Sequence, residues 1–371
     1  MPCAYSLSHV SQLAVMARGN KSAATIRRRH YMSPALREIM IRHKSVSAID
    51  NLDSDDDDIE YFDSEVFIQS PLLRLLLSSQ WTLFLGLAAF RSINALIIQT
   101  SFVPDEYWQC IEVAHKMVFG FGYLTWEWRA GLRSYVYPVI VATLYKMLAL
   151  LHLDYRILLI KLPRLLHALF AATGDLYLYK LSYRLCGHEV AVWSLICQLM
   201  SWFTFYCSTR TLTNSLETVL TTVALFYFPW PKKPRKAHWK FISIVGLCIV
   251  IRPTAAILWL PLGVWYLLLW RHVAWKVIRM LAEIGFMILL LSSIVDRICY
   301  GRWVYVHYNF VQFNVISNMG TFYGSHPWHW YITQGFVVVM GSHIFPFLMA
   351  LRKGMQLGFL FLIGWTVAIY R

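Results

Sequence analysis

Two adjacent carboxylates, Asp105 and Glu106, stand in a short segment rich in aromatic residues. Residues 101–109 read Ser-Phe-Val-Pro-Asp-Glu-Tyr-Trp-Gln, so Trp108 and Gln109 follow the acids closely. Aromatic rings stack on pyranose faces, while a carboxylate can orient or deprotonate a hydroxyl. The spacing therefore predicts a sugar site with Asp105 or Glu106 as general base. The alternative is an interfacial aromatic belt with solvated acids.

Two arginines are candidates for contact with phosphate. Arg210 lies among hydroxyl and amide residues in the stretch 208–214, and Arg252 precedes a proline inside an apolar run. An unpaired arginine at membrane depth is costly and marks a functional site by default. Because a guanidinium group can form two parallel hydrogen bonds to a phosphate, both arginines are predicted to bind a lipid-linked phosphate. The alternative is that Glu217 or Asp175 neutralises them within the bundle.

Further polar and aromatic residues in the same kind of segment are candidates for substrate binding. They are Trp108, Gln109, Trp126, Glu127, Asn214, His326, His329 and Trp330. The two histidines could ligate a metal, but no nearby Cys, Asp or Glu completes a site, so no metal is predicted. The sequence has no phosphate-binding glycine loop or dinucleotide fingerprint, and we therefore expect no nucleotide cofactor.

Composition indicates what kind of elements must position these residues. The 371-residue chain is 58% hydrophobic and 15% charged, whereas soluble domains are about 45–50% apolar and about 25% charged. This excludes a soluble enzyme, a fibre and a disordered scaffold, and it predicts an all-α polytopic membrane protein. The net charge of +14 comes with acids concentrated near residues 50–65. The basic excess elsewhere fits positive-inside loops and not a nucleic-acid groove.

The chain divides into two regions. Residues 1–70 are predicted to form a disordered cytosolic tail, because they contain no apolar stretch long enough to span; a transit peptide is the alternative. Residues 71–371 are predicted to form the multi-span membrane domain. Apolar runs of about 20 residues suit a ~30 Å hydrocarbon core, and the candidates are 75–100, 136–153, 157–182, 189–208, 213–230, 241–270, 277–298, 332–350 and 355–370.

Basic loops orient these runs. Lys and Arg cluster at 231–240, at 271–279 and at Arg352-Lys353, and all three clusters should be cytosolic. The candidate residues then fall in external loops. Counting crossings leaves 136–153 unable to cross fully, and Arg252-Pro253-Thr254 should break 241–270 into two short helices.

Several motifs together resemble glycosyltransferase family 22. They are Phe-Val-Pro-Asp-Glu-Tyr-Trp-Gln at 102–109, Gly-Tyr-Leu-Thr-Trp-Glu-Trp at 122–128, Leu-Arg-Ser-Tyr at 132–135, Ser-Thr-Arg-Thr-Leu-Thr-Asn at 208–214 and Gly-Ser-His-Pro-Trp-His-Trp-Tyr at 324–331. The family comprises mannosyltransferases that use dolichol-phosphate-mannose. The resemblance covers roughly residues 70–371 and implies a GT-C-like bundle with a large first lumenal loop.

The resemblance also implies a reaction and a place. It implies transfer of the third mannose, in α1,2 linkage, from dolichol-phosphate-mannose to the GPI-anchor glycolipid. The active site would lie on the lumenal face of the endoplasmic reticulum membrane. Because the donor linkage is β and the product α, the transfer would invert by single displacement, with no cofactor beyond the donor substrate. Asp105 matches the family's loop carboxylate and is the expected base, with Glu106 second; Arg210 and Arg252 would contact the donor phosphate.

Two other functions are compatible with the sequence. Family members of this type continue past the run at 355–370 into a His-Lys-Glu…Arg-Phe motif and more helices, so the chain is expected to be C-terminally truncated. An inactive truncated relative with a binding or assembly role is therefore one alternative. The other is a membrane transporter or scramblase, in which intramembrane arginines line a pathway; the lack of an internal repeat disfavours it.

Overall fold

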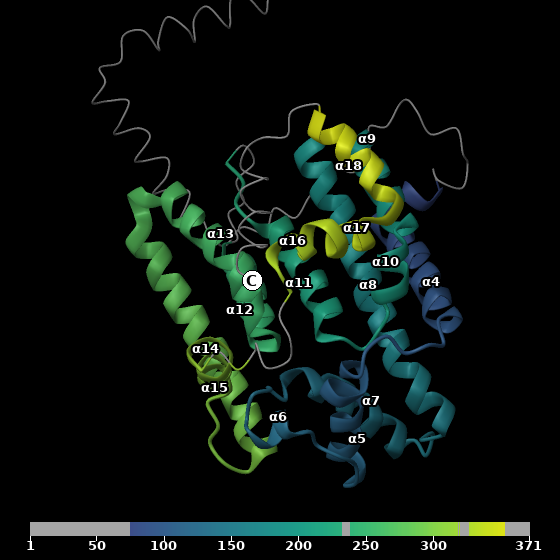
Figure 1. Ribbon diagram of the computed structural model, residues 1–371, viewed down its shortest axis with the longest axis vertical. Coiled ribbons are helices and arrows are strands. Elements are labelled where there is room, and N and C mark those ends of the chain that lie inside the picture. The colour runs from purple at the N-terminus through teal and green to yellow at the C-terminus, as the bar shows by residue number, and fades with distance from the viewer. Residues whose placement is uncertain (1–74, 232–237, 318, 320–325, 353–371) are drawn as a thin grey trace, which may run out of the picture. The chain divides into compact units, whose positions relative to one another are not determined.

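The computed structural model describes residues 75–231, 238–317, 319 and 326–352. Regular secondary structure in these ranges is helical, from α4 (Gln80–Ile97) to α18 (Ile344–Arg352) (Figure 1). Three described helical stretches are long and apolar enough to cross a membrane: Arg156–Cys186, Arg271–Tyr300 and Trp328–Met349. The prediction of an all-α membrane protein is confirmed. The predicted tail 1–70, the core of the basic loop at 231–240 and the run 355–370 fall wholly or almost wholly outside the described residues.

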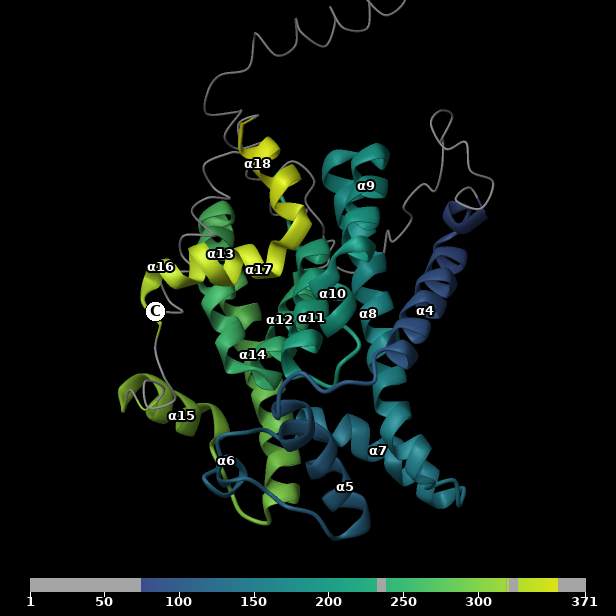
Figure 2. The same ribbon diagram turned by 45° about the vertical axis from the view of Figure 1, so that its right-hand side comes forward.

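One group of helices surrounds a buried ion pair. α4 packs along α8 (Arg156–Cys186), which also packs against α9 (His188–Met200) (Figure 2). Inside this group Arg91 donates to both oxygens of Asp175, at 2.6 and 3.0 Å, and Gln198 donates to the same carboxylate at 3.1 Å. Both charged side chains are almost fully buried, so each neutralises the charge of the other where water cannot.

The predicted span 189–208 is two helices instead of one. α9 ends at Met200, and α10 (Trp202–Cys207) follows after Ser201, which adopts an extended backbone. The Ser201 hydroxyl accepts a hydrogen bond from the backbone nitrogen of Thr204. A serine in this conformation caps a new helix, which is why the apolar run changes direction here.

A second group contains the predicted helix break. α11 (Thr213–Tyr227) packs against α8 and α12 (His238–Ile251), and α12 packs against α14 (Ala274–Tyr300). Between α12 and α13 (Ala256–Leu269) lies a single 3₁₀ turn, Pro253–Ala255. Because proline has no backbone N–H and its ring clashes with the preceding turn, α12 ends here. The predicted break at Arg252-Pro253-Thr254 is confirmed.

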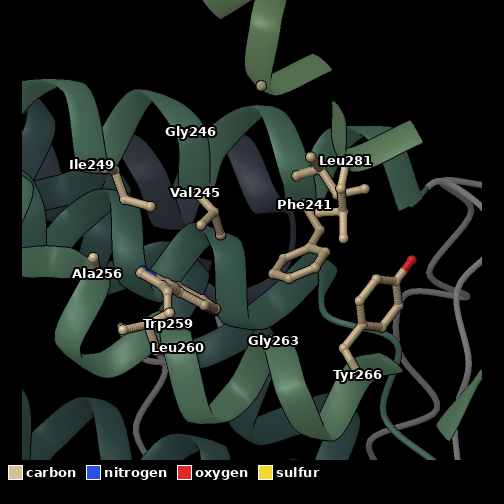
Figure 3. Close-up of a pocket in the computed structure, with 12 residues that line it drawn as sticks. Phe241, Val245, Gly246, Ile249, Ala256, Trp259, Leu260, Gly263, Tyr266 and Leu281 are labelled. Atoms are coloured by element: carbon tan, nitrogen blue, oxygen red, sulfur yellow. The ribbon is translucent and has the colours of Figure 1, made fainter. Parts of the chain in front are cut away.

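An apolar groove of about 230 Å³ lies between α12, α13 and α14. Figure 3 shows Phe241, Trp259 and Tyr266 around it, with glycines on the neighbouring turns. A Cβ atom added at Gly263 would meet nothing within 4 Å. The groove is thus open where helices normally fill space with side chains.

The first predicted external loop folds into short helices. They are η1 (Tyr107–Ile111), α5 (Glu112–Phe119) and α6 (Trp126–Arg129), followed by α7 (Val136–Leu150). α5 and α7 share an apolar cluster built around Ala114, Tyr137 and Val141. A 15-residue helix is about 22 Å long, shorter than a ~30 Å hydrocarbon core. This length agrees with the prediction that 136–153 does not cross fully.

Candidate functional site

The two adjacent carboxylates have opposite environments. Asp105 is exposed, whereas Glu106 has only 1% of its surface accessible. Glu106 already has helical backbone angles, and the Pro104 carbonyl accepts hydrogen bonds from the backbone nitrogens of Tyr107 and Trp108. Successive residues on a helix point about 100° apart, so the two acids cannot face the same way. Glu106 faces the interior of the helix bundle, and Asp105 faces the surface of the protein.

Glu106 is paired with arginines inside the protein. Its Oε1 accepts from Arg210 Nη1 at 2.8 Å and from the backbone nitrogen of Phe102 at 2.6 Å. Arg164 Nη2 lies 3.7 Å from its other oxygen. Removing one partner of such a buried pair costs about 3–5 kcal/mol. These contacts place Glu106 where it can fix the loop, and they give a hydroxyl substrate no access to it.

Arg210 directs all three of its guanidinium nitrogens at protein acceptors. Besides the bond to Glu106, Nη1 donates to the Thr100 carbonyl at 2.8 Å and Nε to the Tyr206 carbonyl at 2.8 Å. Nη2 donates to the Thr100 hydroxyl at 3.3 Å. Arg210 is 1% exposed, so this geometry favours a role in holding the loop over the predicted contact with phosphate.

Arg252 remains partly accessible at the helix break. Its Nη1 lies 2.5 Å from Glu217 Oε2, and about a quarter of the Arg252 side chain is exposed. The alternative that Glu217 neutralises Arg252 therefore describes the structure correctly. Asp175 instead neutralises Arg91, a residue that sequence reasoning missed because it lies inside an apolar run without a motif.

Asp105 has an electrostatic environment built from three separate segments. Although Asp105 is exposed, the protein atoms around it exclude part of its water. This partial burial raises the pKa of the Asp105 carboxyl above its ordinary value of 3.8, and the charge of Glu127 acts in the same direction. The guanidiniums of Arg133 and Arg252 and a hydrogen bond with Gln109 oppose this rise in pKa. The structure thus brings the predicted residues Asp105, Gln109, Glu127 and Arg252 together.

Arg133 is a member of this site that the sequence reasoning did not single out. It forms a bidentate ion pair with Glu127: Arg133 Nε donates to Oε2 at 3.2 Å, and Nη2 donates to Oε1 at 3.0 Å. Both side chains are one-quarter exposed. The available signal was its position in the Leu-Arg-Ser-Tyr motif at 132–135, a polar loop with few other cations.

The predicted sugar-binding aromatics lie on the same folded loop. Trp108 is 39% and Trp126 43% exposed. Trp108 and Tyr123 pack edge to face with ring centroids 5.9 Å apart. The ring centroids of Trp126 and Phe313 are 5.3 Å apart. Trp128 Nε1 donates to the Trp108 carbonyl at 3.0 Å. This bond ties the segment of Trp126 and Glu127 to that of Asp105.

The remaining predicted residues lie in two other places. Asn214 is exposed in the first turn of α11, where its side chain accepts from Thr213 at 3.3 Å. His326 stacks on Trp330 with ring centroids 4.1 Å apart, and His329 is exposed beside them.

The segment that follows the histidines contacts other helices. Trp202 of α10 donates to the Val338 carbonyl at 3.0 Å, and a ring nitrogen of His343 lies 2.9 Å from the Cys197 carbonyl of α9. In Figures 1 and 2, α16 (Trp328–Trp330) lies away from α6, which carries Trp126 and Glu127. Among the described residues, no hydrogen bond, ion pair or ring contact joins His326, His329 or Trp330 to Asp105.

Within the part of the chain that the structure describes, no three His, Cys, Asp or Glu side chains gather as a metal site. The expectation that the protein uses no metal stays a prediction. What the described site offers is the carboxylates of Asp105 and Glu127, two partly accessible arginines and exposed aromatic rings.

The comparisons identify the class of protein. The profile of the Alg9-like mannosyltransferase family, glycosyltransferase family 22, matches residues 82–371. The chain belongs to this family, and the resemblance drawn from the motifs is confirmed. No solved structure matches it significantly.

Individual relatives sharpen this assignment. The chain is 51% identical over 278 residues to the GPI alpha-1,2-mannosyltransferase 3 of Homo sapiens. The matched region covers 73% of the chain and 49% of that protein. It is 42% identical over 271 residues to the GPI mannosyltransferase 3 of Drosophila melanogaster, covering 73% and 46%. For the protein of that name from Debaryomyces hansenii, the identity is 39% over 272 residues, covering 70% and 49%. The chain spans about half the length of the curated relatives it matches.

Proposed function

We propose that this protein transfers the third mannose, in α1,2 linkage, to the GPI-anchor precursor. The names of the relatives supply the substrate class. The observation that carries the proposal at atomic level is the exposed carboxylate of Asp105 beside Arg133 and Arg252. A glycosyl transfer from a phosphate donor needs one base and nearby cations, and these three residues provide both.

The proposed donor is dolichol-phosphate-mannose. Asp105 takes the proton from the acceptor hydroxyl while that oxygen attacks the anomeric carbon. The bond from that carbon to the phosphate oxygen breaks on the opposite face, so the β donor gives an α product and dolichyl phosphate leaves. Arg252 stabilises the negative charge on the departing phosphate, as its accessible guanidinium allows.

Glu106 and Arg210 support this reaction without touching the reacting atoms. The buried Glu106–Arg210 pair fixes the turn on which Asp105 stands, since the two acids are consecutive. Thr211 adds a hydrogen bond from its hydroxyl to the Glu106 carbonyl at 3.1 Å. A base held in this way loses less entropy on reaching the reactive geometry.

The exposed rings and polar groups around Asp105 are proposed to hold the sugars. Trp108 and Trp126 offer stacking faces. The Glu127 carboxylate can accept hydrogen bonds from sugar hydroxyls, and the Gln109 amide can accept or donate. We assign Asn214, His326, His329 and Trp330 to more distant parts of the two substrates.

The apolar groove of Figure 3 is proposed to receive hydrocarbon of a lipid-linked substrate. It begins near the break that carries Arg252 and is lined almost wholly by apolar atoms. A phosphate held at Arg252 would place an attached lipid tail at one end of this groove. We place the protein in the endoplasmic reticulum membrane with Asp105 on the lumenal side.

The test is complementation of cells that lack the third GPI mannosyltransferase. The 371-residue chain should restore GPI-anchored proteins at the cell surface, and membranes containing it should extend a two-mannose GPI intermediate by one mannose. A full-length relative serves as positive control. No restoration by a chain that accumulates to the level of the control would refute the proposal.

A further inference from the structure

The C-terminal end of α14 is hydrogen-bonded to the segment that carries Arg133. Asp296 Oδ1 accepts from the backbone nitrogen of Tyr135 at 2.7 Å and from the Ser134 hydroxyl at 3.1 Å. One helical turn later, the Tyr300 hydroxyl donates to the Arg133 carbonyl at 2.7 Å. Residues four apart share one helix face, so α14 bonds three consecutive residues of the loop from a single face.

The free-energy cost of burying the Asp296 carboxylate argues that these hydrogen bonds do more than connect a loop to a helix. Asp296 is only 2% exposed and lies in a stretch long and apolar enough to cross a membrane. A carboxylate in such a place is expensive and is retained where a specific partner needs it. Its partners here are the donors that fix the backbone immediately after Arg133.

The same loop is held at further points by the residues after α14. Asn309 Nδ2 donates to the Gly131 carbonyl at 3.2 Å, and Arg302 Nη2 to the Arg129 carbonyl at 3.3 Å. Gly131 has φ +68°, and a Cβ there would lie 2.5 Å from Val304. The loop between Glu127 and Tyr135 is thereby fixed along its length, and its charged side chains have little freedom to move.

We propose that Asp296 is a positioning residue of the Asp105 site: by holding residues 133–135, it keeps the Arg133 guanidinium beside Asp105. The inference rests on the proposed function, in which Asp105 is the base. Asp296 itself touches neither substrate nor Asp105. It acts through Arg133, whose charge favours the ionised, proton-accepting form of Asp105.

The test measures the protonation of Asp105 directly, without turnover. The full chain in detergent is treated at a series of pH values with a carbodiimide and an amine, which label protonated carboxyls, and labelling of Asp105 is followed by mass spectrometry. Arg133→Gln should move the midpoint of labelling upward by about one pH unit, and Asp296→Ala should move it in the same direction. Loss of the Asp296 charge alone would lower the midpoint, so a rise isolates the displacement of Arg133.

Three controls separate positioning from other effects. Asp296→Asn removes the same charge but keeps an oxygen for Tyr135 and Ser134, so its midpoint should not rise. Glu283→Ala removes an exposed acid of α14 that pairs with Arg279, and it should leave the midpoint unchanged. Tyr300→Phe removes one hydrogen bond at little cost in packing; it should give a smaller rise, and it carries the test if Asp296→Ala does not fold.

An unchanged midpoint in Asp296→Ala and Tyr300→Phe would overturn the inference, as would an equal rise in Asp296→Asn. The titration needs no mannose transfer. A wild-type chain that fails to transfer mannose therefore refutes the proposed function, while the role of Asp296 is still decided by the labelling midpoints.

Discussion

At the scale of single residues, neighbouring acids take different roles because the backbone turns between them. Glu106 pairs with Arg210 and Arg164 in the interior, whereas Asp105 is exposed and is influenced by the charges of Arg133 and Arg252. The interior acid is buried and neutralised by arginines, whereas the exposed acid keeps oxygen lone pairs for a substrate. This division makes Asp105 the better candidate for the base.

Asp105→Asn should lower mannose transfer by about 10²–10⁴-fold, the usual contribution of a general base. Asp154→Asn is the matched control, because Asp154 is an exposed acid between α7 and α8. Because burial raises the Asp105 pKa above 3.8, wild-type activity should fall with decreasing pH before an ordinary aspartate would be protonated. Transfer by Asp105→Asn at the rate of Asp154→Asn would remove Asp105 from the mechanism.

At the scale of elements, the break between α12 and α13 has two consequences. It exposes Arg252 at a helix end, and it leaves the two short helices and α14 around an apolar groove. A continuous helix would hide the arginine among apolar neighbours. A proline in the sequence is therefore connected directly to the proposed phosphate contact.

Filling the groove should weaken donor binding. Gly263→Leu adds a side chain where the glycine has open space, so it should fold and raise the KM for the lipid-linked donor several-fold with a smaller change in kcat. Gly263→Ala, which adds one methyl group, is the graded control. Val264→Leu controls for added bulk, since Val264 is exposed on the same helix and is not among the groove-lining residues. Equal KM values for all three variants would assign the hydrocarbon to another surface.

At the scale of the whole molecule, the chain is a helical membrane protein of a mannosyltransferase family. Its charges predict which loops face the cytosol, and they predict that the loops of the proposed site face the other side of the membrane. The relatives are about twice as long as the matched region.

Glycosylation mapping tests the orientation. Gly320→Thr creates an acceptor sequence at Asn318, and this site should be glycosylated because the loop is predicted to be lumenal. The double substitution Arg235→Asn and Ala237→Thr places one in the basic loop, which should stay unmodified. Both positions lie outside the described residues, and a gel shift reports each. Modification of the basic loop alone would reverse the predicted orientation.

Much of the fold was predictable because its signals are local. Long apolar runs define most helices, and Pro253 ends α12 through its own geometry. The split at Ser201 was missed, since a polar residue inside an apolar run does not by itself signal a cap. The chemistry-bearing segment at 101–109 was also visible, because acids are rare in the membrane domain.

The sequence by itself determined the family, the helical membrane class and the segment that holds Asp105. Only the tertiary structure decided which polar side chains pair: Arg210 with Glu106 across 104 residues, Arg91 with Asp175 across 84, and Ser134 with Asp296 across 162. These pairings depend on how distant helices pack, and helix packing is set by side-chain shape over whole surfaces. No local pattern encodes it, and so the buried role of Arg210 and the contribution of Arg133 emerged only from the folded chain.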